Sequence, residues 1–247
     1  PRSTHCISSA ASDVYKRQDM TKLKLSSNKE SVLNEIGDGK FNLDFDGYIL
    51  HLKSFIPKEQ CNQIVSSLRE LEKDKSTPYT DGLLNNNADT YFDPDIPTID
   101  EVSKKIFVDG LKTYSERVRA FNWSYYGTDT LHYSEMIIRK YNEKSIFDYH
   151  HDDIISEIFP HWFLRRQNIL TCIVYFNDNT EYTGGKLQFA SSDKEYTPNI
   201  GDVIIFPANW MYYHKVSEIT SGTRYSGALL FYFGSSKKMP NALSKNW

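Results

Sequence analysis

The sequence predicts a mostly β fold with flanking helices, an α+β arrangement built around a sandwich or barrel of short strands. The second half of the chain contains several short apolar or alternating segments, closely spaced and separated by turn-forming residues. Aromatic residues make up 14% of the 247 residues, which favours strands. Two segments with helical spacing lie in the first half, and we expect them to pack against the sheet.

The first half begins with an expected strand at 47–55, in which Tyr48, Leu50 and Leu52 alternate with other residues. Pro57 then stands at a favoured first-turn position, and helical spacing continues to about residue 73. The stretch from about 74 to 97 is rich in Asp, Asn, Thr and Pro and predicts a long loop. A second helix is expected from about 99 to 121.

Strand patterns dominate the second half of the chain. We expect strands within 131–141, 168–176, 186–190 and 203–206. The segments 211–219 and 223–233 are expected to form a hairpin about Ser221-Gly222.

Global composition narrows the classes of partner. The net charge is −3, which gives no indication of nucleic acid or an anionic membrane as a partner. No apolar run approaches the roughly 18 residues of a membrane span. The three cysteines have no metal-site spacing, so we expect a reduced, cytoplasmic setting.

Domain organisation is expected to be simple. Residues 1–19 are polar, lack helical periodicity and precede a plausible initiator, Met20, so they are interpreted as a non-native or disordered leader. Residues 20–247 are then one domain, with helical support over about 47–121 and a strand core over about 131–233.

A doubled His-x-Asp motif is the main candidate for chemistry. It occurs as His150/Asp152 and again as His151/Asp153. Residues two apart on a strand point to the same face, so either pair can direct an imidazole and a carboxylate to one point. Two imidazoles and one carboxylate on one side of an octahedral ion suit non-haem Fe(II) oxygenases, and His214 is the best candidate for the second imidazole. Strand alternation alone leaves both pairs open.

Several motifs follow one another in an order that resembles a known family. Tyr141, Phe147, His150 and Asp152 come first; strands ending at Asn177 and Phe189, a Pro-x-x-Gly turn at 198–201, His214 and Arg224 follow. This order resembles the Fe(II)/2-oxoglutarate dioxygenases, most closely the prolyl 4-hydroxylase branch, over about 131–233. The resemblance implies a double-stranded β-helix (jelly-roll) core and selects the pair His150/Asp152. Lys144 stands where the family usually has glycine.

The resemblance also implies a cofactor and a cosubstrate. Fe(II) would be bound by His150, Asp152 and His214. The reaction would use 2-oxoglutarate and O₂ as cosubstrates, with ascorbate as a reductant. Arg224 would bind the far carboxylate of 2-oxoglutarate, for which its planar fork is suited. Ser226 shares the strand face of Arg224, and Tyr175 and Tyr141 match further positions of the pocket. No catalytic residue is expected beyond the metal ligands.

The expected activity is prolyl 4-hydroxylation of peptidyl proline, with release of succinate and CO₂. The same chemistry on a free amino acid or another small metabolite is the alternative, and a non-catalytic jelly-roll binding module is a third. Nucleic-acid demethylation is disfavoured because Leu230 stands where that group has a second arginine. For a peptide groove, the segment 74–97 and the side chains of Tyr91, Phe92 and Trp162 are candidates.

Overall fold

A computed structural model of the protein describes residues 45–73, 79–80, 88–92, 94–118, 121, 131–153 and 167–233. All of them belong to one compact unit, which begins at Asp44. The leader expected at 1–19 lies outside the described residues. Among the helices that the structure describes, none combines the length and apolarity needed to cross a membrane.

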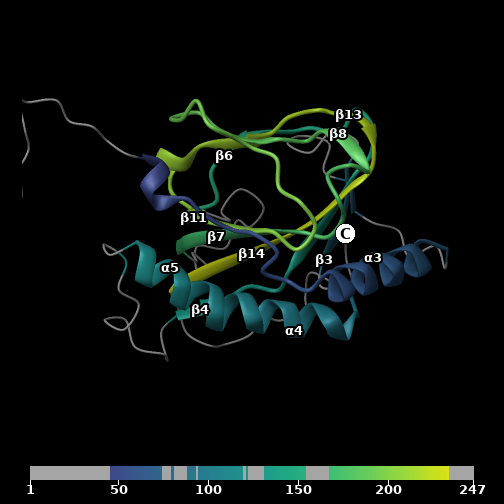
Figure 1. Cartoon of the computed structure of the whole chain (residues 1–247), viewed down its shortest axis with the longest axis horizontal. Coiled ribbons are helices and arrows are strands. Elements are labelled where there is room, and N and C mark those ends of the chain that lie inside the picture. The colour runs from purple at the N-terminus through teal and green to yellow at the C-terminus, as the bar shows by residue number, and fades with distance from the viewer. Residues whose placement is uncertain are drawn as a thin grey trace, which may run out of the picture. The chain divides into compact units, whose positions relative to one another are not determined.

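The larger of two facing sheets is antiparallel throughout and carries the long strands β7 and β14 at its centre (Figure 1). Its order is β1 (Leu50–Leu52), β11 (Val203–Pro207), β7 (Gln167–Tyr175), β14 (Arg224–Phe233), β5 (Ile137–Tyr141), β3 (Ala88–Phe92) and β2 (Tyr79–Thr80), with β4 (Leu131–Tyr133) paired to β14. The central strands are apolar on both faces because helices cover one face and the second sheet covers the other.

The smaller sheet has the order β10 (Glu195–Tyr196), β9 (Leu187–Phe189), β12 (His214–Val216) and β6 (Phe147–His150). A separate pair of strands, β8 (Tyr182–Gly184) and β13 (Ile219–Gly222), continues this layer (Figure 1). Two apolar clusters fill the space between the layers, one around Phe189 and Phe206 and the other around Phe147 and Val216. This arrangement confirms the expected jelly-roll core with flanking helices.

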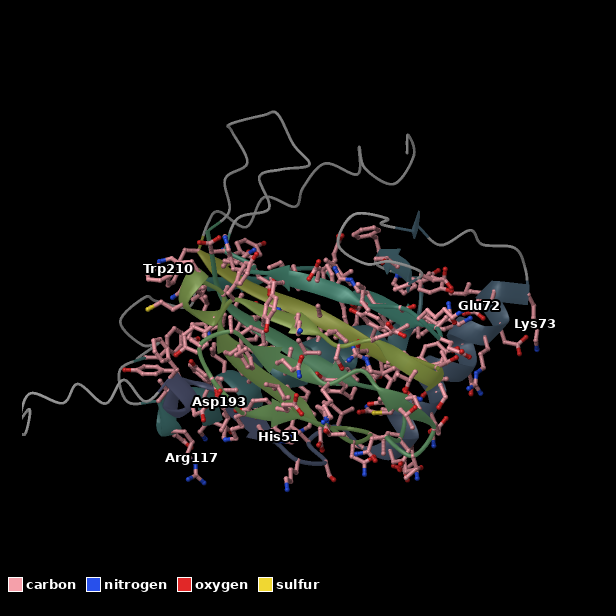
Figure 2. The ribbon with its side chains drawn as sticks, turned by 90° about the horizontal axis from the view of Figure 1, so that it is seen from above. His51, Glu72, Lys73, Arg117, Asp193 and Trp210 are labelled. Carbon is pink, nitrogen blue, oxygen red and sulfur yellow. The ribbon has the colours of Figure 1, made fainter. Side chains whose placement is uncertain are left out.

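Helices cover the outer face of the larger sheet (Figure 1). They are α3 (Lys58–Lys73), α4 (Pro97–Lys105), a π-helical segment η3 (Ile106–Gly110) and α5 (Leu111–Arg117), and the short 3₁₀ turns are η2 (Phe45–Tyr48) and η6 (Trp210–Tyr212). Ile64, Leu68 and Val102 are fully buried in one core with Cys172 and Leu229 of the sheet. Glu72, near the end of α3 (Figure 2), binds the Nζ of Lys140 of β5 at 3.0 Å.

Part of the stretch expected to be a loop at 74–97 is strand. Strand β3 pairs with β5 in a five-residue register, and β2 pairs with β3. The prediction was wrong because Asp89 and Thr90 are polar, whereas the pairing depends on backbone hydrogen bonds that composition does not indicate. The second helix also begins earlier than expected, at Pro97, a position that proline favours.

The expected hairpin between 211–219 and 223–233 is also wrong. Strand β12 pairs with β6 and β9, whereas β14 pairs with β4, β5 and β7. Gly222 ends β13 with a φ of +76°, and a Cβ there would lie 2.1 Å from the carbonyl oxygen of Glu181. This glycine allows the chain to leave one layer and enter the other. His214 and Arg224 therefore lie on opposite sheets and face a common interior.

Candidate active site

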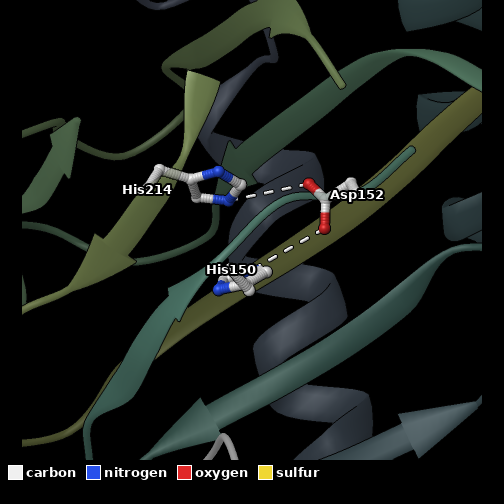
Figure 3. A group of neighbouring side chains, drawn as sticks. All are labelled: His150, Asp152 and His214. Atoms are coloured by element: carbon white, nitrogen blue, oxygen red, sulfur yellow. Dashed lines mark ion pairs between the residues drawn. The ribbon is translucent and has the colours of Figure 1, made fainter. Parts of the chain in front are cut away.

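Two histidines and one aspartate converge between the sheets. His150 ends β6, His214 begins β12, and the two residues are direct partners in the register of these strands. Asp152 lies between them: its Oδ1 is 3.6 Å from His150 Nε2, and its Oδ2 is 3.6 Å from His214 Nε2 (Figure 3). One ligating atom from each of the three lies within 4.8 Å of the others. That spacing allows the three side chains to share one metal ion.

Backbone carbonyls orient both imidazoles. The Nδ1 of His150 lies 2.7 Å from the carbonyl oxygen of Asp148, and the Nδ1 of His214 lies 2.9 Å from that of Tyr212. A carbonyl only accepts hydrogen bonds, so each Nδ1 carries the proton. Each Nε2 is therefore left with a free lone pair directed toward Asp152, which is the form needed for metal binding.

The carboxylate of Asp152 is held from the larger sheet. Thr171 Oγ1 of β7 donates a 2.7 Å hydrogen bond to Asp152 Oδ2. Asn168 Nδ2 donates to the backbone carbonyl of Asp152, and the Asp152 amide donates to Ala208. Burial raises the pKa of Asp152, but the two imidazoles and the Thr171 hydroxyl outweigh burial and hold this pKa below its ordinary value. The carboxylate is therefore ionised at neutral pH.

Both imidazoles are neutral at physiological pH. Burial, followed by the charge of His214, lowers the pKa of His150 to about 4. Burial is also the main cause of the lowered pKa of His214, which the negative charge of Asp152 only partly offsets. Two neutral imidazoles and one carboxylate form the donor set that suits Fe(II) in oxygenases.

The second His-x-Asp pair takes no part in this cluster. His151 Nδ1 lies 2.6 Å from Asp153 Oδ1, so the two side chains pair with each other. His151 is exposed and its ring lies 6.1 Å from that of Tyr213, on the outer side of the smaller sheet. Strand alternation alone could not choose between the two His-x-Asp pairs. In the structure, His150 and Asp152 lie in the cluster, whereas His151 and Asp153 lie outside it.

A buried arginine lies at another part of the same interior. Arg224, the first residue of β14, is 1% exposed. Its Nη1 donates to the carbonyl of Gly185 at 2.6 Å and its Nη2 donates to Ser226 Oγ at 3.3 Å. The guanidinium carbon lies 4.2 Å from the ring centroid of Tyr141 and 5.5 Å from that of Tyr175.

Arg224 forms no ion pair with any acidic residue that the structure describes. Its Nε and the hydroxyl of Tyr175 are both buried without a hydrogen-bond partner in the described part of the chain. An unpaired buried charge is costly, so an arginine in this environment indicates the binding place of an anion. One pocket is lined by His150, Asp152, His214, Arg224, Ser226 and Tyr141.

Comparison with known families identifies this arrangement. Residues 136–232, which include the three-residue cluster and Arg224, match the family model of the 2OG-Fe(II) oxygenase superfamily. This part of the chain, residues 136–232, is therefore a 2OG-Fe(II) oxygenase domain. It is a 2-oxoglutarate-dependent dioxygenase, and the family uses Fe(II), 2-oxoglutarate and O₂.

Solved structures similar to the oxygenase include several prolyl hydroxylases. A collagen prolyl hydroxylase of Paramecium Bursaria Chlorella virus-1, in complex with 2-oxoglutarate, is 15% identical with a TM-score of 0.54, covering 76% of this chain and 98% of the viral one. A Pseudomonas putida prolyl-4-hydroxylase is 13% identical with a TM-score of 0.55, covering 76% and 92%. A Trichoplax adhaerens prolyl hydroxylase, in complex with a peptide fragment of hypoxia inducible factor, is 14% identical with a TM-score of 0.53, covering 76% and 84%.

At these identities the likeness establishes the jelly-roll fold of the oxygenase. No curated protein sequence matches the chain.

Two residues of the oxygenase pocket were missed by sequence reasoning. Thr171 is the one hydroxyl within the apolar run 169–174 of β7, which is a signal that it contacts something polar. Arg139 of β5 also lines the pocket. It lies two residues before Tyr141 and so shares its strand face, which the two-residue period of a strand could have shown.

The residues proposed for a peptide groove are not brought together. Tyr91 is buried, and its hydroxyl donates to Glu72 of α3 at 2.9 Å, so it belongs to the contact between helix and sheet. Phe92 is 59% exposed. Trp162 lies outside the described residues.

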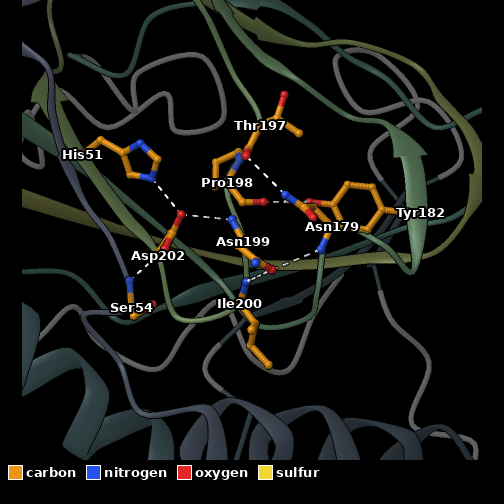
Figure 4. Close-up of polar contacts among 9 residues, drawn as sticks. All are labelled: His51, Ser54, Asn179, Tyr182, Thr197, Pro198, Asn199, Ile200 and Asp202. Carbon is orange, nitrogen blue, oxygen red and sulfur yellow. Dashed lines mark hydrogen bonds and ion pairs between the residues drawn. The ribbon is translucent and has the colours of Figure 1, made fainter.

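The Pro-x-x-Gly turn of the oxygenase has a structural role outside the pocket. Asp202, which follows Gly201, is buried and accepts from the backbone amides of Ser54 and Asn199 at 2.8 and 3.0 Å (Figure 4). Its Oδ2 also lies 2.7 Å from His51 Nε2. These contacts fasten β1 and the start of the helical layer to the turn before β11.

Proposed function

We propose that this pocket binds Fe(II) through His150, Asp152 and His214, binds 2-oxoglutarate through Arg224, and hydroxylates peptidyl proline. The observation that carries the proposal is that a His-Asp-His cluster and a buried arginine without a described countercharge line the same pocket. A metal-free binding module has no need of both features.

The three proposed ligands fit Fe(II) in chemistry as well as in spacing. Two neutral Nε2 atoms and one carboxylate oxygen would hold Fe(II) through three ligands and leave it accessible to a bidentate cosubstrate and O₂. Bound iron supplies O₂ activation coupled to oxidation of 2-oxoglutarate to succinate and CO₂. The protein's own contribution is to fix the tautomers through Asp148 and Tyr212 and the carboxylate through Thr171.

The proposed cosubstrate site fits a dicarboxylate. The Nη1 of Arg224 already donates to the carbonyl oxygen of Gly185. The Nε side of the guanidinium has no described partner and can bind a carboxylate through two hydrogen bonds. Ser226 Oγ and the unpartnered Tyr175 hydroxyl are further donors to the same group. The Tyr141 ring packs against the guanidinium and restricts its rotation.

Proline in a peptide is proposed as the substrate because the fold is like that of prolyl hydroxylases and the Tyr141-to-Asp152 spacing resembles theirs. A proline-rich peptide is already extended, so ordering it in a pocket costs little entropy. A free amino acid or small metabolite is the second candidate, and it is favoured by one observation, the presence of Arg139 in the pocket.

Succinate release tests this function. The purified protein, supplied with Fe(II), 2-oxoglutarate and ascorbate, is assayed against proline-containing peptides and free amino acids, and products are examined by mass spectrometry for one added oxygen atom. Asp152→Ala is the matched inactive control. Absence of 2-oxoglutarate-dependent succinate above that control contradicts the hydroxylase proposal. Faster turnover of free proline than of every peptide removes the peptide substrate and leaves the hydroxylase.

A further inference from the structure

Arg139 is a second cation in the pocket. It lies on β5 between Ile138, which is fully buried in the core under the helices, and Lys140, which pairs with Glu72 on the helical side. Alternation along the strand therefore directs Arg139 to the opposite face, where it lines the pocket together with the His-Asp-His cluster.

An aromatic ring holds the Arg139 side chain in place. Its guanidinium carbon lies 4.6 Å from the ring centroid of Phe147, and that ring lies 3.9 Å from the ring of His150. The Arg139 guanidinium is thus one aromatic ring away from His150, a proposed metal ligand. Stacking of this kind orients the planar group and leaves its N–H donors free in the ring plane.

Arg139 forms no close ion pair in the described part of the chain, although its charge interacts at longer range with that of Asp152. No acidic residue described by the structure forms an ion pair with it, and its Nε is buried without a hydrogen-bond partner there. The side chain is half-buried, so an anion entering the pocket can reach it. An arginine that served only to stabilise the sheet would be expected to pair, as Lys140 does with Glu72.

The position of Arg139 differs from that of the proposed cosubstrate anchor. In the register of β5 and β14, Arg224 is the partner of Tyr141, whereas Arg139 is the partner of Ser226. The two arginines are thus offset by two residues along the sheet, roughly 7 Å. Two residues beyond Ser226 on the same face of β14, the pocket-lining residue is the small Ala228, which leaves space beside Arg139.

We propose that Arg139 determines substrate specificity by binding a carboxylate of the primary substrate, so that the enzyme prefers a substrate with an acid group near the hydroxylated carbon. This inference rests on the proposed function, because it assigns the substrate class of the same pocket. The acid group is either the α-carboxylate of a free amino acid or an acidic side chain beside proline in a peptide. Guanidinium recognises both through the same bidentate contact.

Pairs of compounds that differ only in the acid group test the proposal. L-proline is compared with L-prolinamide, and a Pro-Glu peptide with the Pro-Gln peptide. For at least one pair, kcat/KM should favour the acid by about tenfold or more, as expected for a charged hydrogen-bond pair. Arg139→Met, similar in length and neutral, should lose that preference mainly through KM, and Arg139→Glu should reverse it in favour of a Pro-Lys peptide.

The matched control is Lys215→Met. Lys215 follows His214 in sequence but faces outward, 4.7 Å from the ring of Tyr149. The Lys215→Met substitution removes one positive charge close to the same site without changing the pocket. The preference of this variant for the acid should therefore equal that of the wild type. Equal loss of preference in this variant would show a general electrostatic effect and overturn the assignment.

A measurement of substrate binding tests the role of Arg139 independently of whether the protein hydroxylates the substrate. The melting temperature of the protein loaded with Mn(II) and 2-oxoglutarate is measured with each compound, so that no turnover is needed. In the wild type, the acid of at least one pair should raise the melting temperature more than the corresponding amide does. In Arg139→Met, the acid and the amide should raise it equally. If neither acid exceeds its amide, the inference is wrong even where hydroxylation is observed. If Arg139→Met weakens 2-oxoglutarate binding without substrate as strongly as Arg224→Ala, Arg139 belongs to the cosubstrate site and the inference is also wrong.

Discussion

At the residue scale, the proposed metal site depends on atoms that never touch the ion. Carbonyls of Asp148 and Tyr212 fix the protonation of the two Nδ1 atoms, and Thr171 fixes the aspartate. Residues that hold metal ligands in this way commonly change metal affinity by about 10–100-fold when removed.

Thr171→Val tests this support. Valine has nearly the same shape but cannot donate to Asp152 Oδ2, so we expect Fe(II) affinity to fall by about tenfold or more. Thr171→Ser retains the hydroxyl and should stay close to the wild type. Metal affinity is measured anaerobically by competition with a chelator, and equal affinity in the valine variant would show that the hydrogen bond is dispensable.

Arg224→Ala tests the cosubstrate anchor. Removing one partner of a buried charged pair costs about 2–5 kcal/mol, so the 2-oxoglutarate requirement should rise strongly while Fe(II) binding is retained. Arg224→Lys should keep part of the affinity, because it keeps the charge but not the planar fork. An unchanged 2-oxoglutarate KM in the alanine variant would remove Arg224 from the site.

The depressed histidine pKa values predict how stability depends on pH in metal-free protein. Burial, then His214, holds the pKa of His150 at about 4 in the folded state, against 6.5 for an unperturbed histidine. The unfolded chain therefore takes up the proton first, so stability present above pH 6.5 is lost as the pH falls toward 4. From this group alone, the free energy of unfolding should fall by about 1 kcal/mol between pH 7.5 and 5.5.

Urea denaturation in the presence of a chelator measures that loss. His150→Gln lacks the titrating group, so its stability should change less over the same range, although His214 still contributes. A His150→Gln variant with the full pH dependence of the wild type would contradict the assignment of this loss to His150.

At the element scale, the turn between β5 and β6 departs from the family pattern in sequence but keeps a glycine-like backbone. Lys144 has a φ of +68°, in the left-handed region, where the family usually has glycine. Its amide donates to the carbonyl of Ile219 at 2.8 Å, and the amide of Ile219 donates to Ser145. The turn is thus bound to β13, which holds this backbone in its strained conformation.

Lys144→Gly should stabilise the protein. A non-glycine residue in the left-handed region costs about 1–2 kcal/mol, which exceeds the entropic cost of glycine in the unfolded chain, so we expect a gain of about 0.5–1 kcal/mol. Lys144→Ala is the matched control, because it removes the exposed side chain but keeps the strain. Urea midpoints distinguish them, and an equal gain in both variants would mean that the side chain rather than the backbone is responsible.

The same scale shows where sequence patterns were sufficient. Helix α3 and strands β7, β11 and β14 were predictable because their apolar periodicity is set by burial against a large core. Strand β3 was not, because its polar residues gain their strand conformation from pairing with β5. The sheet that each of the last strands joins was not predictable either, because a single glycine, Gly222, redirects the chain from one sheet to the other.

At the scale of the whole molecule, the two sheets bring together residues that local patterns could not place. His150 and His214 come from the smaller sheet, whereas Arg224, Thr171 and Arg139 come from the larger one. The ordered motifs and the family resemblance were enough to name the cluster and Arg224. Arg139 was missed because its role depends on which face of β5 meets the other sheet, which only the assembled layers define.

The central claim is that one pocket binds Fe(II) and 2-oxoglutarate together, and anaerobic titration tests it most directly. Adding 2-oxoglutarate to the Fe(II)-loaded protein without O₂ should produce the visible charge-transfer absorption of chelated 2-oxoglutarate, saturating with one cosubstrate per chain. His214→Ala should abolish the absorption, and Arg224→Ala should require far more 2-oxoglutarate to reach it. Absence of the absorption in the wild type, or its full retention in His214→Ala, would contradict this account of the site.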